Sequence, residues 1–212
     1  ALEYAIFVKM FSGNYVAAKA QADELVALAE EKAAFVWKQS GTIKQGSVFA
    51  LTGKALEAVR MITSGINGYR STGATVFVPS YTSYLAIAHA ELGRLDDAWR
   101  CIDDAIAAVE RTKEKWFEAE AYRITGEIAL KSPELDVAKA EAYFDRALAV
   151  SRQQQAKSWE LRAAMSMARL WRDQGKRDEA RELLAPIFGW FTEGFDTLDL
   201  KEAKVLLDEL HA

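Results

Sequence analysis

The chain has 212 residues, 50% of them hydrophobic and 27% charged, which is typical of a globular protein and excludes a disordered or collagen-like one. A single cysteine, Cys101, and two histidines, His89 and His211, exclude a disulfide framework and a multi-cysteine zinc site. The net charge of −4 argues against nucleic acid as a partner. Because no signal peptide or membrane-spanning stretch is present, we expect a cytoplasmic protein with no membrane partner.

Apolar residues recur at helical spacing along almost the whole chain, and only three prolines interrupt it, so the sequence predicts an all-α fold. In chain order we expect helices at 2–12, 14–31, 34–52, 54–72, 79–92, 94–111, 115–131, 136–153, 157–174, 176–191 and 199–210. Pro186 lies inside the tenth helix, where we expect a kink. The segment 196–199 is predicted to cap the last helix, with Glu202 as a capping-box residue.

Three columns of residues share one period along the chain. The alanines Ala18, Ala58, Ala98, Ala140 and Ala180 are separated by steps of 40, 40, 42 and 40, and four of them follow a glycine by five residues: Gly13, Gly53, Gly93 and Gly175. The same steps relate the aromatic residues Trp37, Phe77, Phe117 and Trp159 and the small residues Gly46, Ala86, Gly126 and Ala168. The longer step coincides with the segment 131–134, where two extra residues fit in a turn.

A repeat of about 40 residues made of two helices is typical of a solenoid, because neither helix can bury its apolar stripe without neighbours. The sequence therefore predicts a right-handed superhelix of five helix pairs and a capping helix, in one domain over 1–212. We expect the repeats at 1–34, 35–75, 76–115, 116–157 and 158–198, with the cap at 199–212. Because the first repeat begins inside its first helix, we expect the chain to be a fragment of a longer protein.

The first predicted helix is more apolar than the end of a solenoid requires. It carries Leu2, Ala5, Ile6, Phe7, Met10 and Phe11. An upstream helix would cover part of this surface in a larger protein. In this chain we expect an exposed apolar patch and self-association through this N-terminal edge.

The columns resemble those of the tetratricopeptide repeat, in its looser and longer variety: a small residue, a turn glycine and a triplet such as Ala140, Phe144 and Ala147. A closer resemblance is carried by the segments 68–74 (GYRSTGA), 90–94 (AELGR), 116–127 (WFEAEAYRITGE), 171–176 (WRDQGK) and 190–204 (WFTEGFDTLDLKEAK). They are similar to the C-terminal repeat region of bacterial multidomain class III adenylate/guanylate cyclases and related STAND-type ATPase regulators. The resemblance implies a regulatory segment without catalysis.

Catalytic and metal-binding patterns are weak. Thr52-Gly53-Lys54-Ala55 matches part of a phosphate-binding loop, but Val48 stands where the motif needs its first glycine, and Ala55 replaces the metal-binding hydroxyl. The aspartate pairs at 96–97 and 103–104 lie on helices, where adjacent side chains diverge. Cys101 and His89 fall on the two helices of one repeat, where a small packing residue is the simpler interpretation. We therefore predict no enzyme, no cofactor and no metal.

The first helices of such repeats line a concave groove. Their register places Glu120, Arg123, Glu127 and Lys131 there, then Arg162, Met165, Arg169 and Arg172, and earlier in the chain Ser40, Ile43, Ser47, Ser80, Ser83 and Ile87. The groove is predicted to be neutral in its N-terminal half and cationic in its C-terminal half. The arginines would either clamp a carboxylate or phosphate, or pair with Glu120, Glu127 and other acids between helices.

The leading hypothesis is a non-enzymatic protein–protein interaction and regulatory module of a bacterial signalling protein. Its partners would be a protein or peptide, such as other domains of a parent chain. The alternative is a sensor that binds a small anionic ligand or a peptide in the groove, with Glu120, Arg123, Glu127, Arg162, Arg169 and Arg172 as candidate binding residues.

Overall fold

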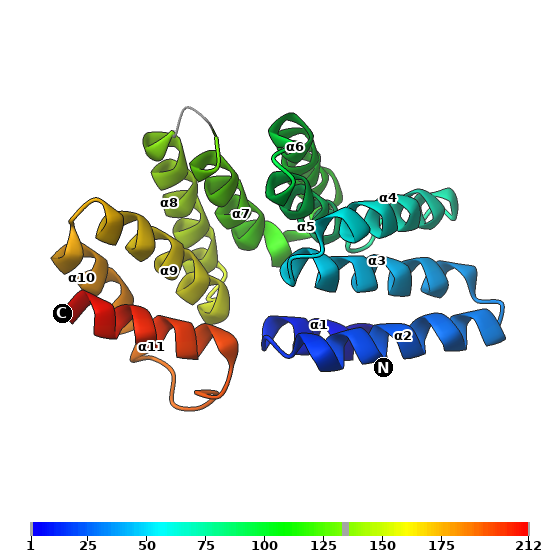
Figure 1. Ribbon diagram of the computed structural model, residues 1–212, viewed down its shortest axis with the longest axis horizontal. Coiled ribbons are helices and arrows are strands. Elements are labelled where there is room, and N and C mark those ends of the chain that lie inside the picture. Colours follow the sequence, from blue (N-terminus) through cyan, green and yellow to red (C-terminus); the bar gives the residue numbers. More distant parts are fainter. Residues whose placement is uncertain (1, 133–135, 212) are drawn as a thin grey trace. The chain divides into compact units, whose positions relative to one another are not determined.

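The computed structural model describes residues 2–132 and 136–211, and within them the regular structure is entirely helical (Figure 1). The helices are α1 (Leu2–Phe11), α2 (Tyr15–Glu31), α3 (Phe35–Leu51), α4 (Ala55–Ser71), α5 (Val78–Glu91), α6 (Leu95–Thr112), α7 (Glu118–Leu130), α8 (Val137–Gln153), α9 (Lys157–Asp173), α10 (Arg177–Phe188) and α11 (Leu198–His211), with a 3-10 turn η1 (Lys115–Phe117) before α7. The predicted all-α class is confirmed.

Most helix ends agree with the predicted ends to within one residue, and two differ by three. The seventh predicted helix begins at Glu118, because the backbone of Phe117 (φ −106°, ψ 2°) is not α-helical and the preceding residues form η1. The tenth ends at Phe188, two residues after Pro186, which does lie inside α10.

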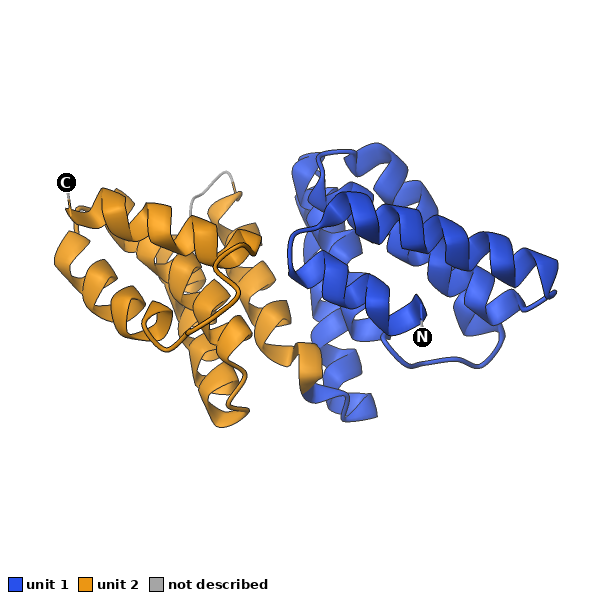
Figure 2. Ribbon diagram, turned by 90° about the horizontal axis from the view of Figure 1, so that it is seen from below, with its two compact units in different colours: residues 1–115 blue, residues 116–212 orange. Residues whose placement is uncertain are grey.

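The chain forms two compact units, residues 1–115 and residues 116–212 (Figure 2). Unit 1 contains three helix pairs, α1/α2, α3/α4 and α5/α6. Unit 2 contains the pairs α7/α8 and α9/α10, followed by α11. The grouping of all repeats into one domain stays a prediction.

The small-residue columns lie where the two helices of a pair pack closely, as predicted. A Cβ atom added to Gly46 would collide with Ile62 on the partner helix, and one added to Gly126 would collide with the ring of Phe144. The corresponding alanines of two other repeats, Ala86 and Ala168, are fully buried. The five alanines in the first turns of the second helices are fully buried as well: Ala18, Ala58, Ala98, Ala140 and Ala180. These columns therefore hold each helix pair together.

The repeat glycines end the first helices in the left-handed conformation. Gly13 has φ 75°, and its N–H donates to the carbonyl of Met10 at 3.1 Å. The N–H of Asn14 then donates to the carbonyl of Lys9 at 2.9 Å, which completes the cap. Gly53 adopts the same conformation (φ 77°), so its place in the turn accounts for the partial phosphate-loop pattern. The residues 133–134 of the predicted longer turn lie outside the described residues.

The predicted capping of the last helix is wrong in its details. α11 begins at Leu198, and the Thr197 hydroxyl donates to the carbonyl of Gly194 at 2.7 Å. Asp199 lies inside the first turn and pairs with Arg162, so it is not the cap, and Glu202 is not free for a capping box. These acids face α9 because an arginine on that helix is a stronger partner than a backbone N–H.

Candidate functional site

A buried ionic layer in unit 2 brings together four of the candidate residues from α7 and α9. Arg123 binds both oxygens of Glu120, with Nε to Oε2 and Nη2 to Oε1 each at 2.8 Å. Arg162 reaches Glu120 Oε1 at 3.4 Å and donates to Asp199 of α11 at 2.6 Å. Arg123 also lies 3.2 Å from Glu127. The layer therefore joins the three helices that enter it through charge-assisted hydrogen bonds.

The electrostatics of this layer favour the charged forms of Glu120 and Arg123. Burial disfavours the Glu120 carboxylate, but Arg123 and then Arg162 outweigh it and hold the pKa of Glu120 below its usual value. Burial likewise disfavours the Arg123 guanidinium, and Glu120 more than compensates, so the pKa of Arg123 is raised. Burial raises the pKa of Asp199, a shift that Arg162 opposes. These charges thus already satisfy one another.

Ser166 of α9 closes the layer at its edge. Its hydroxyl donates to Glu127 Oε1 at 2.6 Å and accepts from Arg123 Nη1 at 3.3 Å. The Glu127 side chain is 38% exposed, whereas that of Glu120 is only 5% exposed. Glu127 is therefore the member of the layer most accessible to a ligand from solvent.

The two remaining candidates, Arg169 and Arg172, lie nearer the surface and pair with acids of α11. Arg169 donates to Glu202 at 2.7 Å, and Arg172 donates to Glu209 at 2.6 Å. Their side chains are 40% and 31% exposed. An open groove of about 240 Å³ lies beside them and is lined by Arg169, Arg172, Lys201, Glu202, Val205, Leu206 and Glu209.

The predicted neutral half of the groove is wrong. Five of the six residues predicted there are at most 1% exposed and cannot line an open surface: Ser40, Ile43, Ser47, Ser80 and Ser83. The sixth, Ile87, is partly exposed. Three of these serines hydrogen-bond backbone carbonyls one turn earlier, as when Ser47 donates to Ile43 O at 2.9 Å. A serine that satisfies its hydroxyl in this way can be buried like a small apolar residue.

Unit 1 instead contains a buried charge cluster that the sequence does not reveal. Lys44 of α3 donates to Glu3 of α1, to the Tyr81 hydroxyl at 3.0 Å and to Ser40 Oγ at 3.2 Å. Ser40 donates to Glu3 Oε1 at 2.8 Å. The Lys44 ammonium lies 4.3 Å from the centre of the Phe7 ring, so an aromatic face covers it. The residues at the position of Lys44 in the following repeats, Tyr84, Ile124 and Ser166, are also buried, but none of them is a charged residue that would indicate such a cluster.

Burial dominates the chemistry of Lys44. The ammonium is fully buried, and this desolvation lowers its pKa to about 8 although Glu3 acts in the opposite direction. Burial also raises the pKa of Tyr81 well above its usual value. The Tyr81 phenol therefore stays protonated and remains a hydrogen-bond donor for the cluster.

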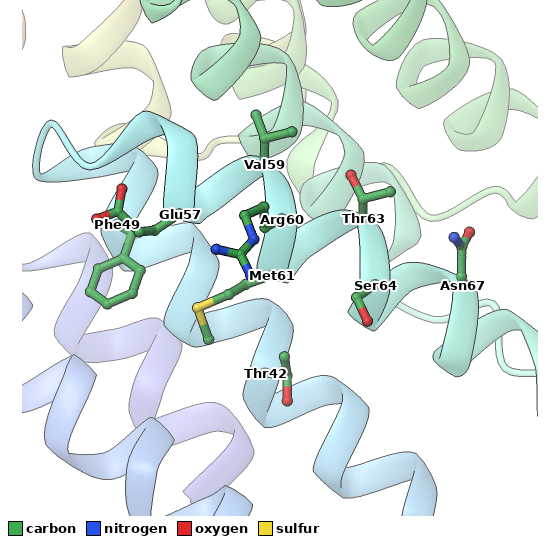
Figure 3. A pocket seen from close by; sticks show the side chains of 9 residues that line it. All are labelled: Thr42, Phe49, Glu57, Val59, Arg60, Met61, Thr63, Ser64 and Asn67. Carbon is green, nitrogen blue, oxygen red and sulfur yellow. The ribbon is translucent and has the colours of Figure 1, made fainter.

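An open groove of unit 1 lies along α4, beside α3. It has a volume of about 820 Å³ and is open to solvent, and Figure 3 shows its α4 side chains running from Glu57 at one end to Asn67 at the other. The groove is lined by Thr42, Phe49, Glu57, Val59, Arg60, Met61, Thr63, Ser64 and Asn67. Within the part of the chain that the structure describes, the side chains of Arg60, Ser64 and Asn67 make no hydrogen bond or ion pair. The groove therefore combines apolar side chains with unused hydrogen-bonding groups.

The weaker chemical patterns have structural explanations. Burial raises the pKa of Cys101 to about 11, so the thiol is not a nucleophile at neutral pH. His89 Nδ1 lies 3.7 Å from Asp97, which itself binds Arg100 at 2.5 Å. Among the described residues, no cluster of three or more His, Cys, Asp or Glu side chains is placed to hold a metal ion. No described helix has the length and apolar character of a membrane span.

A scan against protein-family models finds no match, and neither does a search of curated proteins. Among solved structures, a Rap protein complexed with competence and sporulation factor matches with a TM-score of 0.74 and 16% identity, over 99% of this chain and 56% of that one. TPR-like repeats assigned to a kinesin light chain of Podosopora anserina match in two structures. One matches with a TM-score of 0.58 and 15% identity, over 88% of this chain and 91% of that one. The other matches with a TM-score of 0.56 and 13% identity, over 98% of this chain and 94% of that one.

These likenesses establish the fold. The chain is an all-α solenoid built from tetratricopeptide-like helix pairs. It spans 56% of the Rap protein's length.

Proposed function

We propose that this chain is a non-catalytic module that binds an extended peptide segment of a protein partner in the groove along α4. The observation that carries the proposal is the row of unpaired side chains in that groove, Arg60, Ser64 and Asn67. A peptide in extended form offers backbone N–H and C=O groups that need partners, and such a row supplies them. Met61 and Phe49 add apolar contact area for its side chains.

The spacing of the row fits an extended chain. Arg60, Ser64 and Asn67 stand at positions i, i+4 and i+7 of one helix and therefore share one face, over about 10 Å of helix. About three residues of an extended peptide span that distance. The Asn67 amide can both donate to and accept from a peptide group, and the Arg60 guanidinium suits a carboxylate. An open groove favours a peptide over a small ligand, which usually needs a pocket that encloses most of its surface.

Two further observations support a role in regulation. The Rap protein of similar fold was solved with competence and sporulation factor bound. The segments 116–127 and 190–204 resemble the repeat region of bacterial cyclases and STAND-type regulators. We therefore place the module in a bacterial cytoplasmic signalling protein, where it binds a protein or peptide such as another domain of a parent chain.

The test is to select peptides from a displayed library on the full chain and to measure their affinity as fluorescent peptides. Arg60→Ala combined with Asn67→Ala should raise Kd at least about tenfold, because two hydrogen-bonding partners are lost. The matched control is Arg177→Ala combined with Gln153→Ala. It changes similar residue types at exposed positions of α10 and α8, away from the groove, and should leave Kd unchanged. Equal loss in both variants, or in neither, would overturn the assignment of the groove.

A second candidate function follows from the groove beside Arg169 and Arg172. These two arginines are the most exposed of the candidate arginines in unit 2, and they lie beside an open groove of about 240 Å³. A small anionic ligand or an acidic peptide side chain there would exchange with Glu202 and Glu209. Arg123 and Arg162 would support such a site only indirectly, because Glu120 and Asp199 already pair with them.

A further inference from the structure

The three second helices of unit 1 differ in the sign of their charge. α2 contains four acidic residues and one lysine, and α6 contains five acidic residues and two arginines. α4 contains Glu57 against Arg60 and Arg70, and Lys54 is its N-cap residue. Of these three helices, only α4 therefore has an excess of positive charge, and α4 is the helix that borders the groove of about 820 Å³.

The charged side chains at the start of α4 do not neutralise one another. Glu57 follows Lys54 by three residues and precedes Arg60 by three, a spacing at which helical side chains can pair. Within the ranges that the structure describes, however, the side chains of these three residues form no ion pair and no hydrogen bond. On α2, by contrast, Asp23 pairs with Lys19 at 2.6 Å. The charges of Lys54 and Arg60 thus remain available to a ligand.

Phe49 places the Lys54 ammonium at the groove. The ring of Phe49 lines the groove, and Lys54 Nζ lies 5.2 Å from the centre of that ring. Lys19 Nζ lies 5.6 Å from the same centre, but its acidic partner on α2 neutralises it. Figure 3 shows Glu57 and then Arg60 along α4 at the end of the groove where Phe49 lies. This end therefore carries two unpaired cations against one acid.

We infer that the segment bound in this groove is acidic, with carboxylate side chains lying against Arg60 and Lys54 and its backbone bonded to Ser64 and Asn67. The inference rests on the proposed function, because it names the chemistry of the peptide that the groove binds. A guanidinium group can hold a carboxylate through two parallel hydrogen bonds. The acidic helices α2 and α6 would repel the same segment, so its charge would direct it to α4.

Peptides selected from a displayed library on the full chain test the inference. They should be enriched in Asp and Glu, and a selected set without such enrichment would overturn it. One selected peptide is then compared with a basic version, in which Lys replaces each acid, by fluorescence anisotropy. The native chain should bind the acidic version at least about tenfold more tightly. Lys54→Glu combined with Arg60→Glu should reverse this preference, because two attractions become repulsions.

The matched control is Lys176→Glu combined with Arg177→Glu. Lys176 is the N-cap residue of α10, as Lys54 is of α4, and both control positions are exposed. This variant should keep the preference for the acidic peptide. Circular dichroism should show equal helix content in all variants, because the changed side chains lie on the surface. The preference of the native chain should also shrink as salt rises, since the cations are open to solvent.

A third variant separates the failure of this inference from that of the proposed function. Ser64→Ala with Asn67→Ala removes hydrogen-bonding groups and no charge, so it should weaken both peptide versions by the same factor. If charge reversal at Lys54 and Arg60 also weakens both versions equally, the acidic assignment is wrong and peptide binding in the groove stands. If neither variant changes binding, the proposed function fails as well. Displacement of the acidic peptide by an oligonucleotide of equal charge would overturn the inference, because the groove would then select charge alone.

Discussion

Both units join neighbouring helices through a layer of buried charged side chains, but the charged groups differ between the two units. In unit 1, the first helices α1, α3 and α5 meet at Glu3, Lys44 and Tyr81. In unit 2, the helices α7, α9 and α11 meet at an arginine and carboxylate layer whose centre is Glu120 and Arg162. Each layer replaces apolar contacts between successive helices with hydrogen bonds that require one register.

The difference lies in the number and kind of partners. Lys44 is a single ammonium with one carboxylate partner, and its pKa falls to about 8 because desolvation outweighs the attraction of Glu3. Arg123 and Arg162 share several carboxylates through planar, multivalent guanidinium groups, and the pKa of each is raised. Burial alone therefore does not decide whether a charge is disfavoured. The number of opposite charges that contact the buried group decides whether its charged form is favoured.

The largest predicted effect is the loss of Lys44. Lys44→Met would leave the Glu3 carboxylate 7% exposed with only the hydroxyls of Ser40 and Tyr81 as partners. Breaking a buried pair in this way typically lowers the free energy of unfolding by about 3–5 kcal/mol. Urea unfolding followed by circular dichroism measures it.

The double variant Lys44→Met with Glu3→Leu is the control for this effect. Removing both charges at once leaves no unpaired charge, and such replacements are often neutral or stabilising. We therefore expect the double variant to recover most of the lost stability. A double variant as unstable as Lys44→Met would show that packing of the lysine stem, and not the charge, accounts for the loss.

A smaller loss is expected in unit 2. Arg123→Met removes the bidentate partner of Glu120, but Arg162 remains within 3.4 Å of that carboxylate. The free energy of unfolding should fall by about 2–3 kcal/mol, the range for a hydrogen bond to a charged group together with a partly unsatisfied acid. The same urea experiment applies. A loss larger than that of Lys44→Met would contradict the idea that shared partners protect the layer.

The pH dependence should distinguish the two layers more finely. Lys44 loses its proton near pH 8 in the folded chain and near its usual pKa of about 10.4 when unfolded, so the unfolded chain binds more protons between these values. Stability contributed by this group must then rise with pH across that window, by about 2 kcal/mol from pH 8 to pH 10. Arginine does not titrate there.

The measurement is the difference in unfolding free energy between the native chain and the Lys44→Met, Glu3→Leu double variant. Taking the difference cancels Cys101, whose raised pKa of about 11 makes stability fall with pH over the same range. A difference that stays flat from pH 8 to pH 10 would show that Lys44 keeps an ordinary pKa in the folded chain.

The sequence predicts those structural features that recur in every repeat, and it misses those that occur only once. The small-residue columns recur in each repeat because each helix pair meets the same packing constraint, so the period alone assigns Gly126 and Ala140 to close helix contacts. The pair of Glu3 and Lys44 occurs once and joins residues 41 positions apart, so periodicity carries no signal for it. The local sequence pattern predicts that Asp199 and Glu202 cap a helix. This prediction fails because the two acids bind arginines of α9, and the local pattern carries no information about residues on another helix.

The smallest effect on stability is expected at the surface of unit 2, where Arg169→Ala and Arg172→Ala test whether those arginines bind anything. Each removes a partly exposed pair with α11, worth less than about 1 kcal/mol, so the fold should persist. If this groove binds anions, the double variant should lose binding to a panel of acidic peptides and phosphorylated compounds. That binding should also weaken as salt rises, because the groove is open to solvent. Unchanged binding, with an unchanged circular dichroism spectrum, would identify both arginines as ion-pairing residues that only hold α11 on α9.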